Sequence, residues 1–144
     1  MANKLLVALD GSDGSKRALN AAVKHAKLTG SGLVLAYVID WSPYSFHTPQ
    51  ELEERHKRRE SEIQRANDSV LNPEIAALEA EGINVETVVH HGKIAETLLE
   101  LGDQHGISQI YIGRRGESRI QAMIFGSVSA ALVQTSSVPV TVVP

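Results

Sequence analysis

The stretch from Gly113 to Ser129, GRRGESRIQAMIFGSVS, contains the residues best suited to bind an anion. Gly126 and Ser127 stand at the start of a predicted helix. A helix N-terminus presents free backbone N–H groups and the positive end of the helix dipole, and a glycine there lets an anion come close. Gly116 follows Gly113 by three residues, and an Arg-Arg pair lies between them. The alternative is a loop that turns twice and caps a helix, which needs glycine or serine at only one or two of these positions.

A second candidate loop, LDGSDGS, follows the first apolar run of the chain. Asp10 lies at the carboxyl end of that run, where a carboxylate can accept hydrogen bonds from a ribose hydroxyl or hold a metal ion through water. An ordinary Asp-Gly turn is the alternative explanation for Asp10. Ser12 and Asp13 are better explained as caps of the next helix.

The motifs of several familiar enzyme classes are missing. The chain has no GxxxxGK[ST] phosphate loop, no GxGxxG after the first apolar run and no GxSxG nucleophile turn. It has no cysteine, and its six histidines show no ligand spacing for zinc. Neither candidate loop contains a histidine, and no residue has an assignable role as a general base. A binding protein is therefore expected more than an enzyme.

Composition places the chain among ordinary globular proteins. It has 144 residues, of which 42% are hydrophobic and 22% charged, so residues 1–144 are expected to form one domain. The net charge of −3 gives no general field that attracts nucleic acid or an anionic membrane, and neither is expected as a partner. The lack of cysteine fits a reducing compartment, and no signal peptide or membrane span is evident, so a cytoplasmic location is expected.

The elements that must position these loops are predicted from hydrophobic patterning. Five nearly continuous apolar runs predict strands buried on both faces, at 4–9, 33–39, 85–90, 109–113 and 138–143. The segments between these runs carry apolar residues three and four positions apart, the spacing typical of helices. Thr48, Pro49 and Glu51 form a capping box that begins the long middle helix. The first half of this helix, residues 49–62, is expected to dock loosely. Pro73 is expected to break or bend the chain that follows. The alternation predicts an open, doubly wound parallel five-stranded α/β sheet with helices on both faces.

In such a sheet the ligand binds beyond the carboxyl ends of the strands, where the direction of winding reverses. Four segments of the chain, VALDGS, YVID, HHGKIAETLLELGDQHGISQIYIGRRG and GSVSAALVQTSSVPVTVV, together resemble the universal stress protein family along essentially the whole length. The spacing Gly113-x2-Gly116-x9-Gly126-Ser127 is similar to that of the ATP-binding branch of the family.

The resemblance implies a strand order of 3-2-1-4-5, which brings the two candidate loops together. It implies that Ala8, Asp10 and the backbone near Val38 contact the adenosine part, with Asp10 near the ribose or a metal. It further implies that Ile112 borders the base and that Gly113 and Gly116 shape the turn. The remaining implied contacts to the phosphates come from the N–H or hydroxyl groups of Gly126, Ser127, Val128 and Ser129. Arg119, the basic residue of the nine-residue gap, is expected to reach the phosphates. Arg115 is also expected at the site, but Arg114 and Arg115 cannot both face it if their side chains diverge, and a surface charge is the alternative for either.

The resemblance also implies ATP, or AMP or ADP, with Mg²⁺ or Mn²⁺ bridging phosphate oxygens, and a homodimer formed through the C-terminal strand. The expected function is a nucleotide-dependent regulatory or stress-response switch whose state is read by an unidentified partner protein. A slow ATPase or self-phosphorylating protein and a nucleotide-free interaction module are the alternatives. Two departures stand out: Ala8 replaces a proline common in relatives, and Glu117 follows Gly116, where it is expected to point to solvent.

Overall fold

The computed structural model describes residues 3–40, 48–115 and 126–144. Five strands alternate with helices along the chain, and one π-helix, η1, joins α2 to α3 within the described residues. The elements in chain order are β1 (Lys4–Ala8), α1 (Asp13–Thr29), β2 (Gly32–Asp40), α2 (Pro49–Ala66), η1 (Asn67–Leu71), α3 (Asn72–Ala80), β3 (Val85–Gly92), α4 (Ile94–His105), β4 (Gln109–Gly113), α5 (Ser127–Thr135) and β5 (Val140–Val143). None of the described helices is both long and apolar enough to cross a membrane.

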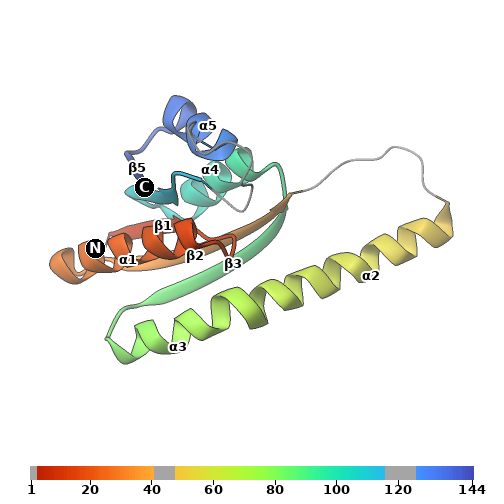
Figure 1. Cartoon of the computed structure of the whole chain (residues 1–144), viewed down its shortest axis with the longest axis horizontal. Coiled ribbons are helices and arrows are strands. Elements are labelled where there is room, and N and C mark those ends of the chain that lie inside the picture. The colour runs from red at the N-terminus through yellow and green to blue at the C-terminus, as the bar shows by residue number, and fades with distance from the viewer. Residues whose placement is uncertain (1–2, 41–47, 116–125) are drawn as a thin grey trace.

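The sheet has the predicted topology. Its five strands are all parallel and lie in the order β3-β2-β1-β4-β5, which confirms the expected order. Winding proceeds from β1 outward to β3 and then returns to β4 on the other side of β1. Figure 1 shows α4 and α5 on one side of the sheet and α2 with α3 on the other. The switch point between β1 and β4 is therefore at the centre of the molecule.

Each face of the sheet carries its own aliphatic core, because successive side chains of a strand point to opposite faces. Leu5, Val7 and Leu9 face α1, η1 and α3, where they meet Leu19 and Leu71. The opposite face packs against α4 and α5. Its buried residues include Leu6, Val34, Ile110, Leu98 and Leu132. Burial on both faces is why the strands read as continuous apolar runs rather than alternating ones.

The long middle helix begins as predicted. The Thr48 hydroxyl accepts a hydrogen bond from the Glu51 N–H (3.1 Å), and the Glu51 carboxylate accepts one from the Thr48 N–H (3.0 Å), which confirms the capping box. The described side chains from 48 to 58 are exposed, as expected for a loosely docked first half. Figure 1 shows this end of α2 extending beyond the sheet.

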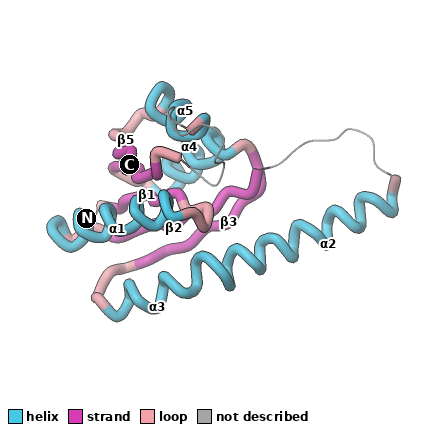
Figure 2. Tube along the Cα trace, in the orientation of Figure 1, coloured by secondary structure: helices cyan, strands magenta, loops and turns pink. Residues whose placement is uncertain are grey.

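Pro73 was expected to break or bend the helix, and the structure shows no break: a π-turn, η1, precedes the proline and accommodates the N–H that it lacks. Pro73 lies in the first turn of α3 and has no N–H for the carbonyl four residues earlier. The Asn72 N–H bonds instead to the carbonyl of Asn67, five residues back. The chain thus continues from α2 through η1 into α3 as one rod, drawn in Figure 2 alongside the long strands β2 and β3.

Candidate functional site

The turn after β1 is organised by its own acidic residue. The Oδ1 atom of Asp10 accepts a hydrogen bond from the Ser12 N–H (2.9 Å) and a second from the Ser12 hydroxyl. The Ser12 hydroxyl in turn accepts from the Ser15 N–H at 3.2 Å, so Ser12 is the N-cap of α1, as predicted. Within the described residues Asp10 has no other hydrogen bond, and its second carboxylate oxygen, Oδ2, is available to a ligand.

Two glycines bring this turn against the chain that leaves β4. A Cβ atom on Gly14 would lie 2.6 Å from the carbonyl oxygen of Arg115. A Cβ atom on Gly113 would lie 2.8 Å from both the carbonyl carbon and the carbonyl oxygen of Gly14. The two candidate loops are therefore in direct backbone contact, as the predicted strand order requires. Sequence reasoning missed Gly14; its one signal is a glycine in a helix's first turn, where propensity disfavours it.

The start of α5 is tied to the end of β4. The carbonyl oxygen of Arg114 accepts from the Gly126 N–H (2.9 Å) and from the Ser129 hydroxyl (3.1 Å). Ser129 is only 2% exposed, and its hydroxyl is also 3.0 Å from the carbonyl oxygen of Gly126. These bonds leave the N–H of Ser129, rather than its hydroxyl, as the group able to meet a ligand.

Among the described residues, no acceptor meets the first N–H groups of α5. Gly126 is the N-cap and provides no side-chain cap, while its carbonyl accepts the first helical bond from Ala130 (3.0 Å). The N–H groups of Ser127, Val128 and Ser129 have no acceptor within the helix. They lie at the positive end of the helix dipole, beside the half-buried Arg114 and Arg115. This arrangement is suited to an anionic group.

An apolar wall adjoins these donors. Four residues that the family resemblance assigns to the site pack in the same core cluster, on the α4–α5 face of the sheet: Ala8, Val38, Ile112 and Val128. Val38 and Ile112 are each 8% exposed, and Ala8 is half-buried. They come from the carboxyl ends of three adjacent strands and the first turn of α5, so the apolar cluster and the donors lie at the same edge of the sheet.

We call the set Ala8–Gly14, Val38, Ile112–Arg115 and Gly126–Ser129 the switch-point cluster. Of the predicted site residues, Gly116 and Arg119 lie outside the described residues, as does Glu117 with its expected orientation. Among the described residues, no group of three histidine, aspartate or glutamate side chains is arranged to hold a metal ion. A cation here would need ligand or water oxygens in addition to Asp10.

Comparison with known proteins gives consistent matches. The sequence model of the universal stress protein family matches residues 1–144. The universal stress protein YxiE of Bacillus subtilis (strain 168) is 31% identical over 150 aligned positions, which cover 99% of each chain. Universal stress protein UspA from Lactobacillus plantarum superimposes with a TM-score of 0.87 at 25% identity, covering 99% of this chain and 97% of that one.

A structure of a universal stress protein in complex with cAMP has the same fold, with a TM-score of 0.65, 23% identity and coverage of 99% and 97%. The structure of the universal stress protein from Archaeoglobus fulgidus in complex with dAMP superimposes with a TM-score of 0.63 at 18% identity, covering 100% and 98%. At these identities the likeness establishes the fold of the chain.

Proposed function

Because the chain belongs to the universal stress protein family, we propose that it binds an adenine nucleotide at the switch-point cluster. One observation carries the proposal: the uncapped N-terminus of α5 lies against the apolar wall of Ala8, Val38 and Ile112. A nucleotide has an apolar face and an anionic end, which is what such a site can bind. The relatives in complex with cAMP and dAMP support an adenine nucleotide as the ligand class.

Within this proposal the nucleotide is ATP. The N–H groups of Ser127, Val128 and Ser129 would bind phosphate oxygens, and the backbone contact between Gly14 and Gly113 would fix the turn beside them. The donor chemistry of Asp10 fits Mg²⁺ or Mn²⁺, because Oδ2 is a carboxylate oxygen without a partner among the described residues. When bound, the ion would neutralise charge between phosphate oxygens.

The regulatory part of the proposal rests on β5, whose outer edge has no neighbouring strand among the described residues. The Pro139 carbonyl accepts a bond from the N–H of Ile110 in β4, and the Val143 carbonyl accepts one from the N–H of Arg114, the residue that follows β4. In a parallel ladder the alternate residues direct their backbone groups away from that neighbour, so Val140 and Val142 present theirs at the edge. We propose that a second copy pairs here and that ATP, by binding one conformation more tightly, sets the state that a partner protein recognises.

The test of nucleotide binding is Ser127→Asp. Ser127 is exposed in the first turn of α5, where a carboxylate favours the helix through its dipole but repels phosphate. We expect unchanged or slightly higher thermal stability, together with a loss of ATP-Mg²⁺ affinity of about tenfold or more by calorimetry. Gln50→Asp is the control, because it adds the same charge to the first turn of α2.

Ser127→Asp and Gln50→Asp together distinguish a nucleotide site at the N-terminus of α5 from a site elsewhere on the protein. ATP binding that is equal in the wild type, Ser127→Asp and Gln50→Asp would place the nucleotide elsewhere and overturn the assignment to α5. Absence of any binding by the wild-type protein would overturn the nucleotide proposal itself, and nucleotide released from freshly purified protein, identified by mass spectrometry, would name the ligand.

A further inference from the structure

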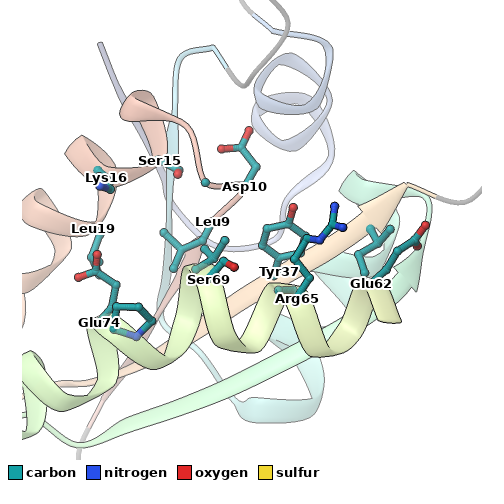
Figure 3. Close-up of a pocket in the computed structure, with 15 residues that line it drawn as sticks. Leu9, Asp10, Ser15, Lys16, Leu19, Tyr37, Glu62, Arg65, Ser69 and Glu74 are labelled. Carbon is teal, nitrogen blue, oxygen red and sulfur yellow. The ribbon is translucent and has the colours of Figure 1, made fainter. Parts of the chain in front are cut away.

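A cavity that we call the α1–α2 cleft lies on the other face of the sheet from the apolar wall of the candidate site. Its volume is about 560 Å³, within the usual range of small-molecule sites. Figure 3 shows its lining, with α1 on one side, the α2–η1–α3 rod on the other and the ends of β1 and β2 between them. Leu9, Leu19 and Tyr37 belong to the core beneath α1 and give the cleft an apolar floor.

The cleft adjoins the switch-point cluster at Asp10. Asp10 and Gly11 line the cleft and also belong to that cluster. Figure 3 shows the Asp10 carboxylate at the edge of the cleft, directed away from Leu9. Its Oδ1 atom is bonded to Ser12, whereas Oδ2 has no partner among the described residues. The cleft is therefore a continuation of the candidate nucleotide site and not a separate site.

The proposed nucleotide site decides which part of the ligand faces the cleft. In a nucleotide the base and the phosphates are attached on either side of the ribose ring oxygen, and the 2′- and 3′-hydroxyls form the opposite edge of the ring. The phosphate donors of α5 and the apolar wall both lie on the α4–α5 side of the sheet. With the base and phosphates on that side, the hydroxyl edge of the ribose is turned toward Asp10 and the cleft beyond it.

The lining of the cleft favours an apolar group over a second anion. Besides the apolar floor it contains three carboxylates, Asp10, Glu62 and Glu74, and two cations, Lys16 and Arg65. The excess of carboxylates gives no attraction for a further phosphate group. An uncharged apolar group gives up no strong hydrogen bonds with water when it enters, and the removal of its surface from water stabilises the complex.

We propose that this site binds adenine nucleotides with an apolar acyl group on the ribose 2′ or 3′ oxygen, and that the acyl group lies in the α1–α2 cleft. The inference rests on the proposed nucleotide site. The hydroxyl that remains free donates to Oδ2 of Asp10, and the second lone pair of that oxygen stays available to a metal ion. The acyl group packs on Tyr37 and on Val70 of the π-turn η1. π-turns of this kind often occur at functional sites.

The experiment uses the full chain and compares nucleotides with and without a group on the ribose. The acylated probe is 2′(3′)-O-(N-methylanthraniloyl)-ATP. We expect it to bind about threefold to tenfold more tightly than ATP by calorimetry, because its ring leaves water on entering the cleft. Adenosine 3′,5′-bisphosphate, which carries an anion in place of the acyl group, should bind no more tightly than AMP.

Ser69→Trp tests where the acyl group lies. Ser69 is exposed in η1 and lines the cleft, so an indole there occupies the space without entering the core. We expect this variant to lose the gain of acylated ATP over ATP while its affinity for ATP stays within about twofold of the wild type. Gln64→Trp is the control and should keep the gain, because Gln64 is exposed on α2 but does not line the cleft.

A measurement on the wild-type protein does not depend on either variant. With ¹³C-labelled Leu and Val methyl groups, acylated ATP should shift the signals of Leu19 and Val70, which line the cleft, relative to their positions with ATP. The signals of Leu98 and Leu101, in the core beneath α4, should be the same with both nucleotides.

The outcomes distinguish this proposal from the nucleotide proposal on which it rests. Equal affinity of the wild type for ATP and acylated ATP, a gain that Ser69→Trp keeps, or tighter binding of the bisphosphate than of AMP would overturn the acyl proposal and leave the nucleotide site in place. A wild-type protein that binds neither nucleotide would overturn both. Ser127→Asp should weaken ATP and acylated ATP by the same factor, because both carry the phosphates that α5 meets.

Discussion

A single methyl group on Gly113 would force the two loops of the switch-point cluster apart. The Cβ of Gly113→Ala would lie 2.8 Å from the carbonyl carbon and oxygen of Gly14, whereas ordinary contact begins at 3.4 Å. To restore ordinary contact, the chain at Gly113 and the chain at Gly14 would have to move apart by about 0.6 Å, the difference between 3.4 and 2.8 Å. Both atoms it meets are backbone atoms at the start of α1, so no side chain can rotate to relieve the contact.

The expected cost is that of overpacking a tight interior, about 1–3 kcal/mol of unfolding free energy. For a chain of this size that corresponds to a melting temperature lower by roughly 3–10 °C. The displaced loop also carries Asp10 and adjoins the donors of α5, so ATP affinity should fall about tenfold, equivalent to about 1.4 kcal/mol. Urea unfolding, thermal unfolding and calorimetry with ATP-Mg²⁺ measure these effects.

Gly32→Ala is the matched control. Gly32 begins β2, and a Cβ there would meet its nearest neighbour, the carbonyl oxygen of Asn84, at 3.4 Å. This contact is ordinary, so stability and ATP affinity should stay close to those of the wild type. If Gly113→Ala matched Gly32→Ala in both quantities, the reasoning that glycine is needed for backbone contact between the loops would be refuted.

Three further predictions concern other parts of the molecule. Val142→Pro removes an N–H from the outer edge of β5 and leaves the hydrogen bonds between β5 and β4 in place. A dimer that pairs at this edge should therefore dissociate, and light scattering should give the mass of a monomer. A dimer that persists would place its interface elsewhere. Ser12→Ala removes the cap of α1 and should cost about 1 kcal/mol in urea unfolding, whereas an unchanged midpoint would contradict the capping role. Glu86→Gln should cost less than about 1 kcal/mol near neutral pH, because Glu86 is half exposed.

The pH dependence of that last effect has a defined sign. The hydrogen bond from Lys4, with His105 also beside the carboxylate, lowers the pKa of Glu86 below its ordinary value of 4.5. The carboxylate therefore contributes stability above its unfolded pKa, and this contribution is lost as pH falls through the folded pKa. Urea unfolding of wild type and Glu86→Gln should converge in acid; a difference that grows there would contradict the assignment.

The sequence by itself determined the architecture of this protein. Strands buried on both faces need continuous apolar runs, and the run at 109–113 coincides with β4. The capping box at Thr48 identified the start of α2, because its two hydrogen bonds join residues three apart. The predicted run at 138–143 begins two residues before β5, where strand pairing rather than hydrophobicity sets the boundary. These features depend on contacts between residues close in the chain or on the short repeat of apolar residues along a strand.

Only the tertiary structure decided how distant segments meet. The contact of Gly14 with Gly113 joins positions that no local pattern relates. The burial of Ser129 results from the path of the chain after β4, and a π-turn rather than a break accommodates Pro73. The α1–α2 cleft likewise gathers side chains from helices and strands that are far apart along the chain. A sequence pattern records what neighbouring residues prefer, but close approach depends on how whole elements pack.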